Sequence, residues 1–248
     1  MAFAQYVSFL PNAFLEGEVQ TLLSAANAAI SPSRSLTKNT IDPFGIIFEM
    51  SGFNIPSVGQ WQINEKQRQA QKSLQNAIGA FHQNILGHIH SNGIQISQNL
   101  GNGHNSGMDV VVPSLSIIAD VKNKFNTLNA KGKLALYDEM HALVSPTVSA
   151  YHSYTAYYVE IISKKPVKSQ LNGIAFMPSD SSTRTRRATH ARIKQISGRN
   201  FYAMVTGIPN ALDLLYDSLP LVIGNISKYT FSAADIAAIN NYFRSACV

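Results

Sequence analysis

Two short runs rich in β-branched residues lie almost back to back in the middle of the chain and constrain its fold most strongly. The stretch "MDVVV" covers residues 108–112 and "SIIADVK" covers residues 116–122, with a Pro-Ser turn between them. Because so few residues separate the two runs, they predict an antiparallel β-hairpin. Asp109 opens the first strand, and Asp120 and Lys122 stand at the end of the second.

The hairpin predicts that these polar side chains converge. Side chains alternate along a strand, so Asp120 and Lys122 share one face. The hairpin folds Asp109 back toward Asp120, and two adjacent carboxylates repel each other unless a cation lies between them. Mg²⁺ prefers oxygen ligands, and the carbonyl of Val121 could add a third. Lys122 could then orient or deprotonate a bound water and stabilise charge on a phosphate. The spacing alone also fits a surface Asp–Lys pair on an edge strand.

The rest of the chain predicts an α/β fold, with a small mixed β-sheet flanked by α-helices. Apolar residues recur at helical spacing over 12–30 and about 62–90, whereas 33–60 reads as irregular because of its Pro and Gly residues. We expect helices at 131–144, 208–219 and 232–243 and an aromatic strand at 154–163. Residues 200–207 fit a strand or a short helix, and the segment before them turns helical from about Thr189. We expect one domain over 1–248, divided as N-terminal 1–60, catalytic core 62–163, basic recognition segment 164–207 and C-terminal helices 208–248.

Positive charge is concentrated in one segment. Residues 164–199 hold nine Lys or Arg residues and one acid, Asp180, for a formal charge of +8, while the rest of the chain sums to −2. Such a patch is the usual electrostatic mark of a polyanion partner. This charge distribution favours a nucleic-acid protein.

The hairpin resembles the PD-(D/E)xK nuclease core, which places an acid at the start of one strand and acid-x-lysine on the next. Met108 stands where that motif has proline, and Asp120 stands where relatives often carry Glu. The strings "NSGMDVVV", "DVKNKFNTLN", "NAIGAFHQNILG" and "ISGRNFYAMVTGIPNALDLLYDSLP" are similar to those of type II restriction endonucleases that cut GGNCC-type sites. The similar blocks run from about residue 62 to 223.

The resemblance implies a catalytic set and a reaction. Asp109, Asp120 and Lys122 would be catalytic and the reaction would depend on Mg²⁺, for which the hairpin offers Asp109, Asp120 and the Val121 carbonyl as ligands. The reaction would be hydrolysis of both strands of double-stranded DNA, leaving 5′-phosphate ends. Many such enzymes add an acid from an upstream helix, for which Glu65 is the candidate, although a Glu near a helix start also suits the helix dipole. A structure-directed nuclease and a non-catalytic DNA-binding protein remain alternatives.

Several polar residues are candidates for contact with DNA. Arg pairs with guanine through two hydrogen bonds, and Ser, Thr and Asn suit phosphates. A solvated loop or a structural role is the alternative for each of them. The candidates are Lys124, Asn126, Thr127, Arg184, Arg186, Arg187, Arg192, His82 and Gln83.

The remaining expectations concern partners and location. Cutting a near-palindromic site on both strands favours a C2 homodimer, and a host DNA methyltransferase would protect the same sites. Cys247 is the only cysteine, so the chain forms no internal disulfide and no cysteine-based zinc site. No apolar run reaches membrane-spanning length and no signal peptide is evident, so we expect a cytoplasmic bacterial protein without membrane contact.

Overall fold

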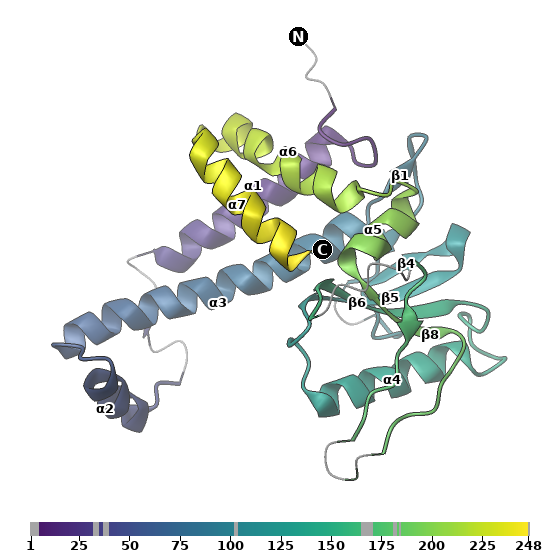
Figure 1. Ribbon diagram of the computed structural model, residues 1–248, viewed down its shortest axis with the longest axis horizontal. Helices are drawn as coiled ribbons and strands as arrows, with labels where there is room; N and C mark the ends of the chain where they lie inside the picture. Colours follow the sequence, from purple (N-terminus) through teal and green to yellow (C-terminus); the bar gives the residue numbers. More distant parts are fainter. Residues whose placement is uncertain are drawn as a thin grey trace.

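The computed structural model describes residues 5–31, 35–36, 40–101, 104–164, 171–180, 183 and 185–247. One six-stranded mixed sheet forms its centre, in the order β3-β4-β5-β6-β8-β7 (Figure 1). Strands β5, β6 and β8 run parallel, whereas β3, β4 and β7 join at the two sides in antiparallel pairs. The strands are β3 (Gln98–Asn99), β4 (Val110–Val112), β5 (Ile117–Lys124), β6 (Thr155–Ile162), β7 (Ile174–Ala175) and β8 (Ile193–Ser197), beside a separate hairpin of β1 (His90–Ser91) and β2 (Ile94–Gln95).

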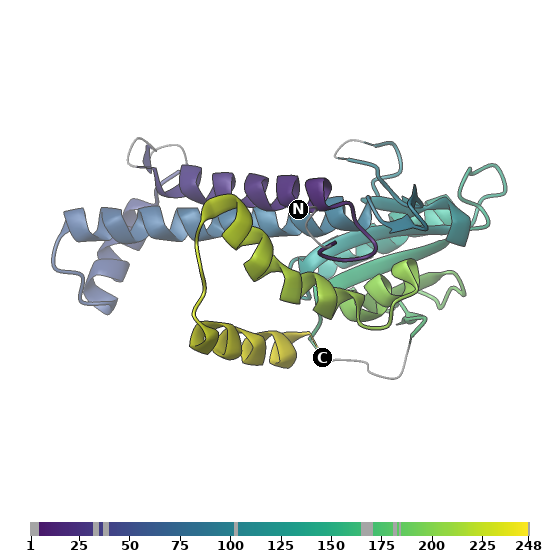
Figure 2. The ribbon, with the colours of Figure 1, turned by 90° about the horizontal axis from the view of Figure 1, so that it is seen from above.

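Helices cover both faces of this sheet and bury two apolar cores (Figures 1 and 2). One face packs against most of the helices, and Ile117, Ala119 and Val121 of β5 point into that core. The other face packs against α4, and Ile118 points into that core. The helices are α1 (Asn12–Ile30), α2 (Pro43–Gly52), α3 (Val58–Leu86), α4 (Ala130–Val144), α5 (Gly198–Thr206), α6 (Ala211–Ser227) and α7 (Ala233–Ala246). The predicted α/β fold is therefore confirmed.

The predicted hairpin is present. Strands β4 and β5 pair antiparallel, with Val110 opposite Ala119, and a short 3-10 turn at Pro113–Leu115 connects them. The main-chain N–H of Asp109 donates to the carbonyl of Ala119 at 2.9 Å, which extends the ladder by one residue. This pairing places the Asp109 backbone beside Asp120.

Three expectations from the sequence are wrong. The stretch 33–60 is not wholly irregular, because Asp42 caps helix α2 by accepting from the N–H of Phe44, and Pro43 suits the first helical turn. The basic segment does not become helical from Thr189, since 193–197 form β8, which lies between the parallel strand β6 and the antiparallel strand β7. Helix α6 continues through Pro220 to Ser227 instead of ending at 219.

Helix α3 extends well beyond the sheet and carries α2 at its far end (Figures 1 and 2). We call α2 and the first half of α3, residues 40–73, the arm. Trp61 of α3 is buried, and its indole N–H donates to Glu49 of α2 at 2.7 Å. This bond fixes α2 against α3. None of the described helices has the length and apolar character needed to cross a membrane.

Candidate active site

Three polar side chains meet at the point where β5 leaves the core. The Lys122 Nζ donates to Asp120 Oδ2 at 2.6 Å and lies 3.5 Å from Asp109 Oδ2. Asp109 Oδ2 also accepts from the main-chain N–H of Val121 at 2.7 Å. The convergence predicted from strand alternation is therefore present, and it places two carboxylates around one ammonium.

Burial gives this group unusual electrostatics. The side chains of Asp120, Asp109 and Lys122 are 7%, 15% and 21% exposed. Burial raises the pKa of Asp120 to about 6; Lys122 opposes this shift and Asp109 adds to it. Burial alone would lower the pKa of Lys122, but the attraction of Asp120 and Asp109 outweighs it and the pKa is raised. Lys122 is therefore a firmly protonated ammonium at neutral pH.

The oxygen atoms at this point fit a hard divalent cation. Asp120 Oδ1 is buried and has no hydrogen-bond partner among the described residues. A cation would satisfy that oxygen and offset the cost of burying the charge. The described ranges contain no group of three or more His, Cys, Asp or Glu side chains that could hold a metal ion. A metal bound here would thus depend on two carboxylates, a carbonyl and water.

Gln83 holds the carbonyl that could complete this set. Its side-chain Nε2 donates to the Val121 carbonyl at 3.2 Å from the last turns of α3. A carbonyl oxygen has two lone pairs, so one remains for a cation. Gln83 therefore orients the β5 backbone, and its predicted direct contact with DNA stays a prediction.

Glu65 does not join the cluster. It lies on α3 eighteen residues before Gln83, which corresponds to roughly 27 Å along a straight helix. Its carboxylate is buried on the arm, where it accepts from Arg68 and from Gln69, both at 2.7 Å. The proposal of Glu65 as the upstream acid is therefore wrong for the site within one chain.

A third acid, beside the cluster, was not predicted from the sequence. Glu160 of β6 lies opposite Lys122 in the parallel register and is 2% exposed. It accepts from Lys133 of α4 and from Gln195 of β8, both at 3.0 Å. The signal was a lone acid in the apolar run "YYVEII", on the same face as Asp120.

The family comparison covers nearly the whole chain. A family model described as Eco47II restriction endonuclease matches residues 7–228. The chain belongs to this family. It is 35% identical to the type II restriction enzyme Eco47II of Escherichia coli over 98% of both chains. It is also 30% identical to the type II restriction enzyme Sau96I of Staphylococcus aureus, over 75% of this chain and 67% of that one. The protein is a type II restriction endonuclease, and its mixed sheet between helices agrees with that core.

In this Eco47II-type endonuclease, several basic residues of the recognition segment have internal partners. Arg187 forms a two-bond ion pair with Asp138 of α4, at 2.9 and 2.6 Å. Arg192 donates to the carbonyl of Val144 at 2.7 Å and so caps the end of α4. These bonds fix the segment on α4, and the predicted contacts of Arg187 and Arg192 with DNA stay predictions.

Three other residues that were predicted to contact DNA are exposed to solvent. Arg186 is exposed on the loop beyond β7, where its backbone bridges to Ser179. Asn126 and Thr127 are exposed in the turn after β5, where the Thr127 hydroxyl donates to the Lys124 carbonyl at 2.8 Å. Arg184 lies outside the described residues. The turn after β5 follows the cluster directly along the chain.

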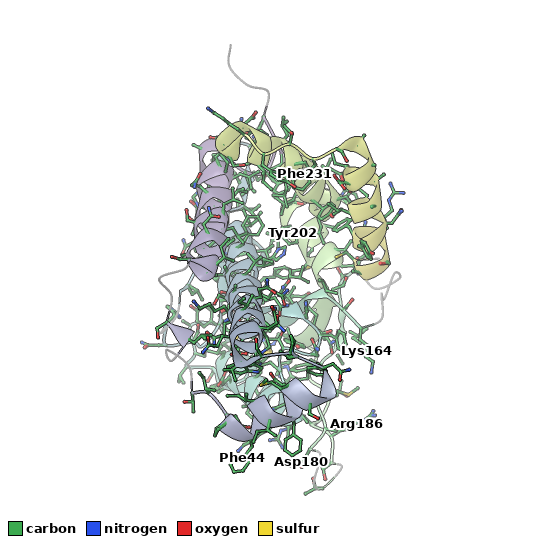
Figure 3. The ribbon with its side chains drawn as sticks, turned by 90° about the vertical axis from the view of Figure 1, so that its left-hand side faces the viewer. Phe44, Lys164, Asp180, Arg186, Tyr202 and Phe231 are labelled. Atoms are coloured by element: carbon green, nitrogen blue, oxygen red, sulfur yellow. The ribbon has the colours of Figure 1, made fainter. Side chains whose placement is uncertain are left out.

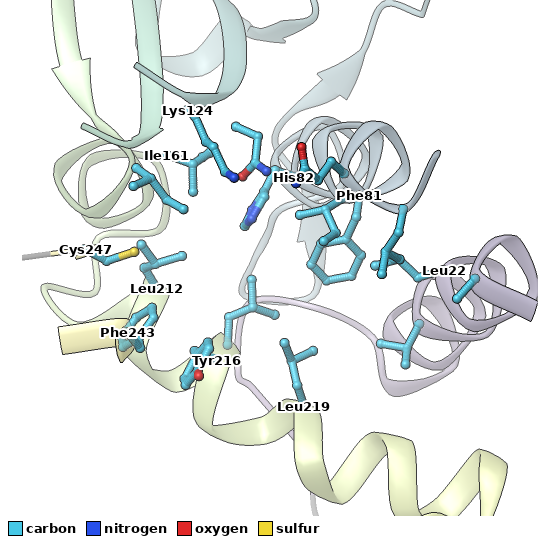
Figure 4. A pocket seen from close by; sticks show the side chains of 18 of the residues that line it. Leu22, Phe81, His82, Lys124, Ile161, Leu212, Tyr216, Leu219, Phe243 and Cys247 are labelled. Atoms are coloured by element: carbon cyan, nitrogen blue, oxygen red, sulfur yellow. The ribbon is translucent and has the colours of Figure 1, made fainter. Parts of the chain in front are cut away.

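An apolar pocket on the opposite side of β5 is lined by two further residues that were predicted to contact DNA. His82 and Lys124 line this pocket of about 490 Å³, between α1, α3, α6 and α7 (Figure 4). Burial lowers the pKa of His82 to about 4, and its Nδ1 lies 3.0 Å from the hydroxyl of Tyr202. His82 is therefore neutral at neutral pH, and its predicted contact with DNA stays a prediction.

Proposed function

We propose that this endonuclease hydrolyses both strands of duplex DNA at a short G/C-rich, GGNCC-like site in a Mg²⁺-dependent reaction that leaves 5′-phosphate ends. The observation that carries the proposal is the convergence of Asp109, Asp120 and Lys122 beside the free oxygen of Asp120. Both relatives are type II restriction enzymes, which supports restriction of DNA. The GGNCC-like site is inferred from the sequence resemblance.

The cation would be held by Asp109, Asp120 and the Val121 carbonyl. When bound, Mg²⁺ would supply a Lewis acid for the phosphate and for the leaving 3′ oxygen. Gln83 keeps the Val121 carbonyl in place from the other side. Because Asp109 also accepts from the Val121 N–H, the relative position of the two strands is set before DNA arrives.

Lys122 would act as a cation toward the substrate. Its raised pKa leaves no free base at neutral pH, so we assign it to orienting the attacking water and offsetting charge on the phosphate. The Lys133–Glu160–Gln195 group beside it would hold the α4 face of the site rigid. Arg186, Asn126 and Thr127 are the proposed contacts to DNA.

Two symmetric cuts require two such sites. We propose a C2 homodimer, whose twofold axis matches that of a near-palindromic site. A host methyltransferase of the same specificity would act on the DNA and not on this protein. A bacterial cytoplasmic location follows from that role.

Digestion of a sequenced phage DNA tests this function. The reactions would contain Mg²⁺, EDTA, or Mg²⁺ with DNA methylated at GGNCC sites. Discrete fragments with 5′-phosphate ends that map to GGNCC-like sites, only in the first reaction, are expected. A metal-dependent smear would instead indicate a nonspecific or structure-directed nuclease, and intact DNA in every condition would refute the catalytic proposal.

A further inference from the structure

The arm exposes a cluster of large apolar side chains. Phe44, Ile47 and Phe48 lie on one face of α2 at helical spacing, and Phe53 follows the helix directly. Their exposed fractions are 73%, 66%, 75% and 74%. We call these four residues the arm patch. Phe44 points away from the rest of the molecule (Figure 3).

The arm patch has the wrong chemistry for contact with nucleic acid. Helix α2 contains no Lys or Arg, and its single acid, Glu49, is bonded to Trp61 on the α3 side. Binding to the DNA backbone depends on positive charge, which this face lacks. An uncharged face of aromatic and aliphatic side chains instead favours another protein surface.

The rings of the arm patch supply about half of the area that a stable dimer interface buries on each partner. A phenylalanine carries about 150–250 Å² of surface, so the three rings together expose on the order of 400 Å². Exposed apolar patches larger than a few hundred Å² commonly mark interaction sites. A stable interface buries about 800 Å² per partner. Ile47 and the neighbouring polar rim of the arm would supply the remainder.

The position of the arm suggests which protein covers it. Helix α3 carries α2 past the carboxyl ends of β5 and β6, where the catalytic cluster lies, so core and arm enclose an angle on that side (Figure 1). If two copies meet at α2, they would form a U-shaped dimer with one active site on each inner side. A face without charge can also meet its own copy without placing like charges together.

We propose that the arm patch is the dimer interface, where α2 of one copy packs against α2 of a second copy. The inference rests on the proposed function, because that function requires two active sites on one duplex. The pairing is isologous: each arm patch contacts the same residues of its partner. No element of the catalytic cluster takes part in the contact.

Sedimentation without DNA tests the interface apart from catalysis. The wild-type chain is expected to be a dimer at micromolar concentration. The Phe44→Ser/Phe48→Ser variant is expected to dissociate with a Kd raised on the order of 100-fold. Because both rings are exposed, its melting temperature as a monomer is expected to stay high. The control Val148→Ser removes a side chain that is 94% exposed outside the arm and should remain dimeric.

Disulfide trapping tests the pairing itself. Phe48→Cys in a Cys247→Ser background is expected to give a covalent dimer on oxidation, and Val148→Cys in that background is expected to stay unlinked. A wild-type monomer, or a dimer unchanged by both serine substitutions, would overturn the inference.

Cleavage is scored separately on the same samples. A dimer that dissociates as described but never cuts DNA would refute the proposed function and leave the interface standing. A wild-type monomer that cuts both strands at a defined site would refute the interface and leave the proposed cleavage of DNA standing. The trapped Phe48→Cys dimer is expected to cut both strands of one site.

Discussion

Lys122 and Asp120 project from the same face of β5, and their Nζ and Oδ2 atoms lie 2.6 Å apart. Asp120 is buried and Lys122 is the first half-buried residue of the strand, and Asp109 adds a second carboxylate beside them. Burial disfavours the charged form of Asp120, and Lys122 only partly offsets this effect, since the pKa of Asp120 remains raised to about 6. A site that disfavours its own charge in this way gains from a bound cation, and the following predictions depend on that relationship.

The acid side of the pH–rate profile should report Asp120. Below about pH 6 the carboxylate takes up a proton and loses the negative charge that a cation needs, so cleavage should fall as the pH drops. Protons and Mg²⁺ compete for the same oxygen atoms, so raising the Mg²⁺ concentration should move the midpoint to lower pH. Single-turnover cleavage measured over pH and Mg²⁺ concentration checks this. A midpoint pH that stays the same at every Mg²⁺ concentration would contradict this prediction.

Gln83→Leu should weaken metal binding without abolishing cleavage. The substitution removes the donor to the Val121 carbonyl but leaves both carboxylates in place. Loss of a residue that orients a metal ligand typically costs about 10–100-fold in affinity or activity. The Mg²⁺ concentration for half-maximal cleavage should rise by that order. Gln62→Leu, an exposed position of the same helix, is the matched control and should behave as wild type.

Glu65→Gln should leave cleavage within about threefold of the wild type, because Glu65 lies far from the cluster along α3. Stability should fall by about 1–3 kcal/mol, since a buried carboxylate loses its charge-assisted bonds with Arg68 and Gln69. Thermal unfolding and single-turnover cleavage of the same preparation separate the two effects. A loss of cleavage by several orders of magnitude would show that Glu65 does serve the active site.

Arg186→Ala and Arg192→Ala should fail in different ways. Arg186 is exposed, so its removal should weaken DNA binding. The slope of log Kd against log salt concentration should fall by about one. Arg192 caps α4 through the Val144 carbonyl, so its removal should lower the melting temperature and affect the Kd little. Titration of labelled DNA at several salt concentrations, alongside thermal unfolding, distinguishes them. If Arg186→Ala instead lowered the melting temperature and Arg192→Ala weakened DNA binding, the roles of the two residues would be exchanged.

The sequence was sufficient for the hairpin and its polar face, because strand alternation is a local property. The lone acid in "YYVEII" obeys the same rule, although its partners Lys133 and Gln195 come from two other elements and could not be foreseen. The internal bonds of Gln83 and Arg192 likewise depend on how α3 and α4 pack on the sheet. Helix α2 was missed because Pro43 and its glycines suggest a loop, while the cap at Asp42 outweighs them.

The most direct test of the catalytic cluster compares wild type and Asp120→Asn on one DNA duplex that carries a mapped site. Binding in Ca²⁺ and single-turnover cleavage in Mg²⁺ would be measured on the same folded protein. The asparagine keeps the shape of the side chain but removes the charge, so binding should stay within a few-fold while cleavage falls by at least about 10²–10³-fold. Cleavage by Asp120→Asn at the wild-type rate would contradict the assignment of this cluster as the active site.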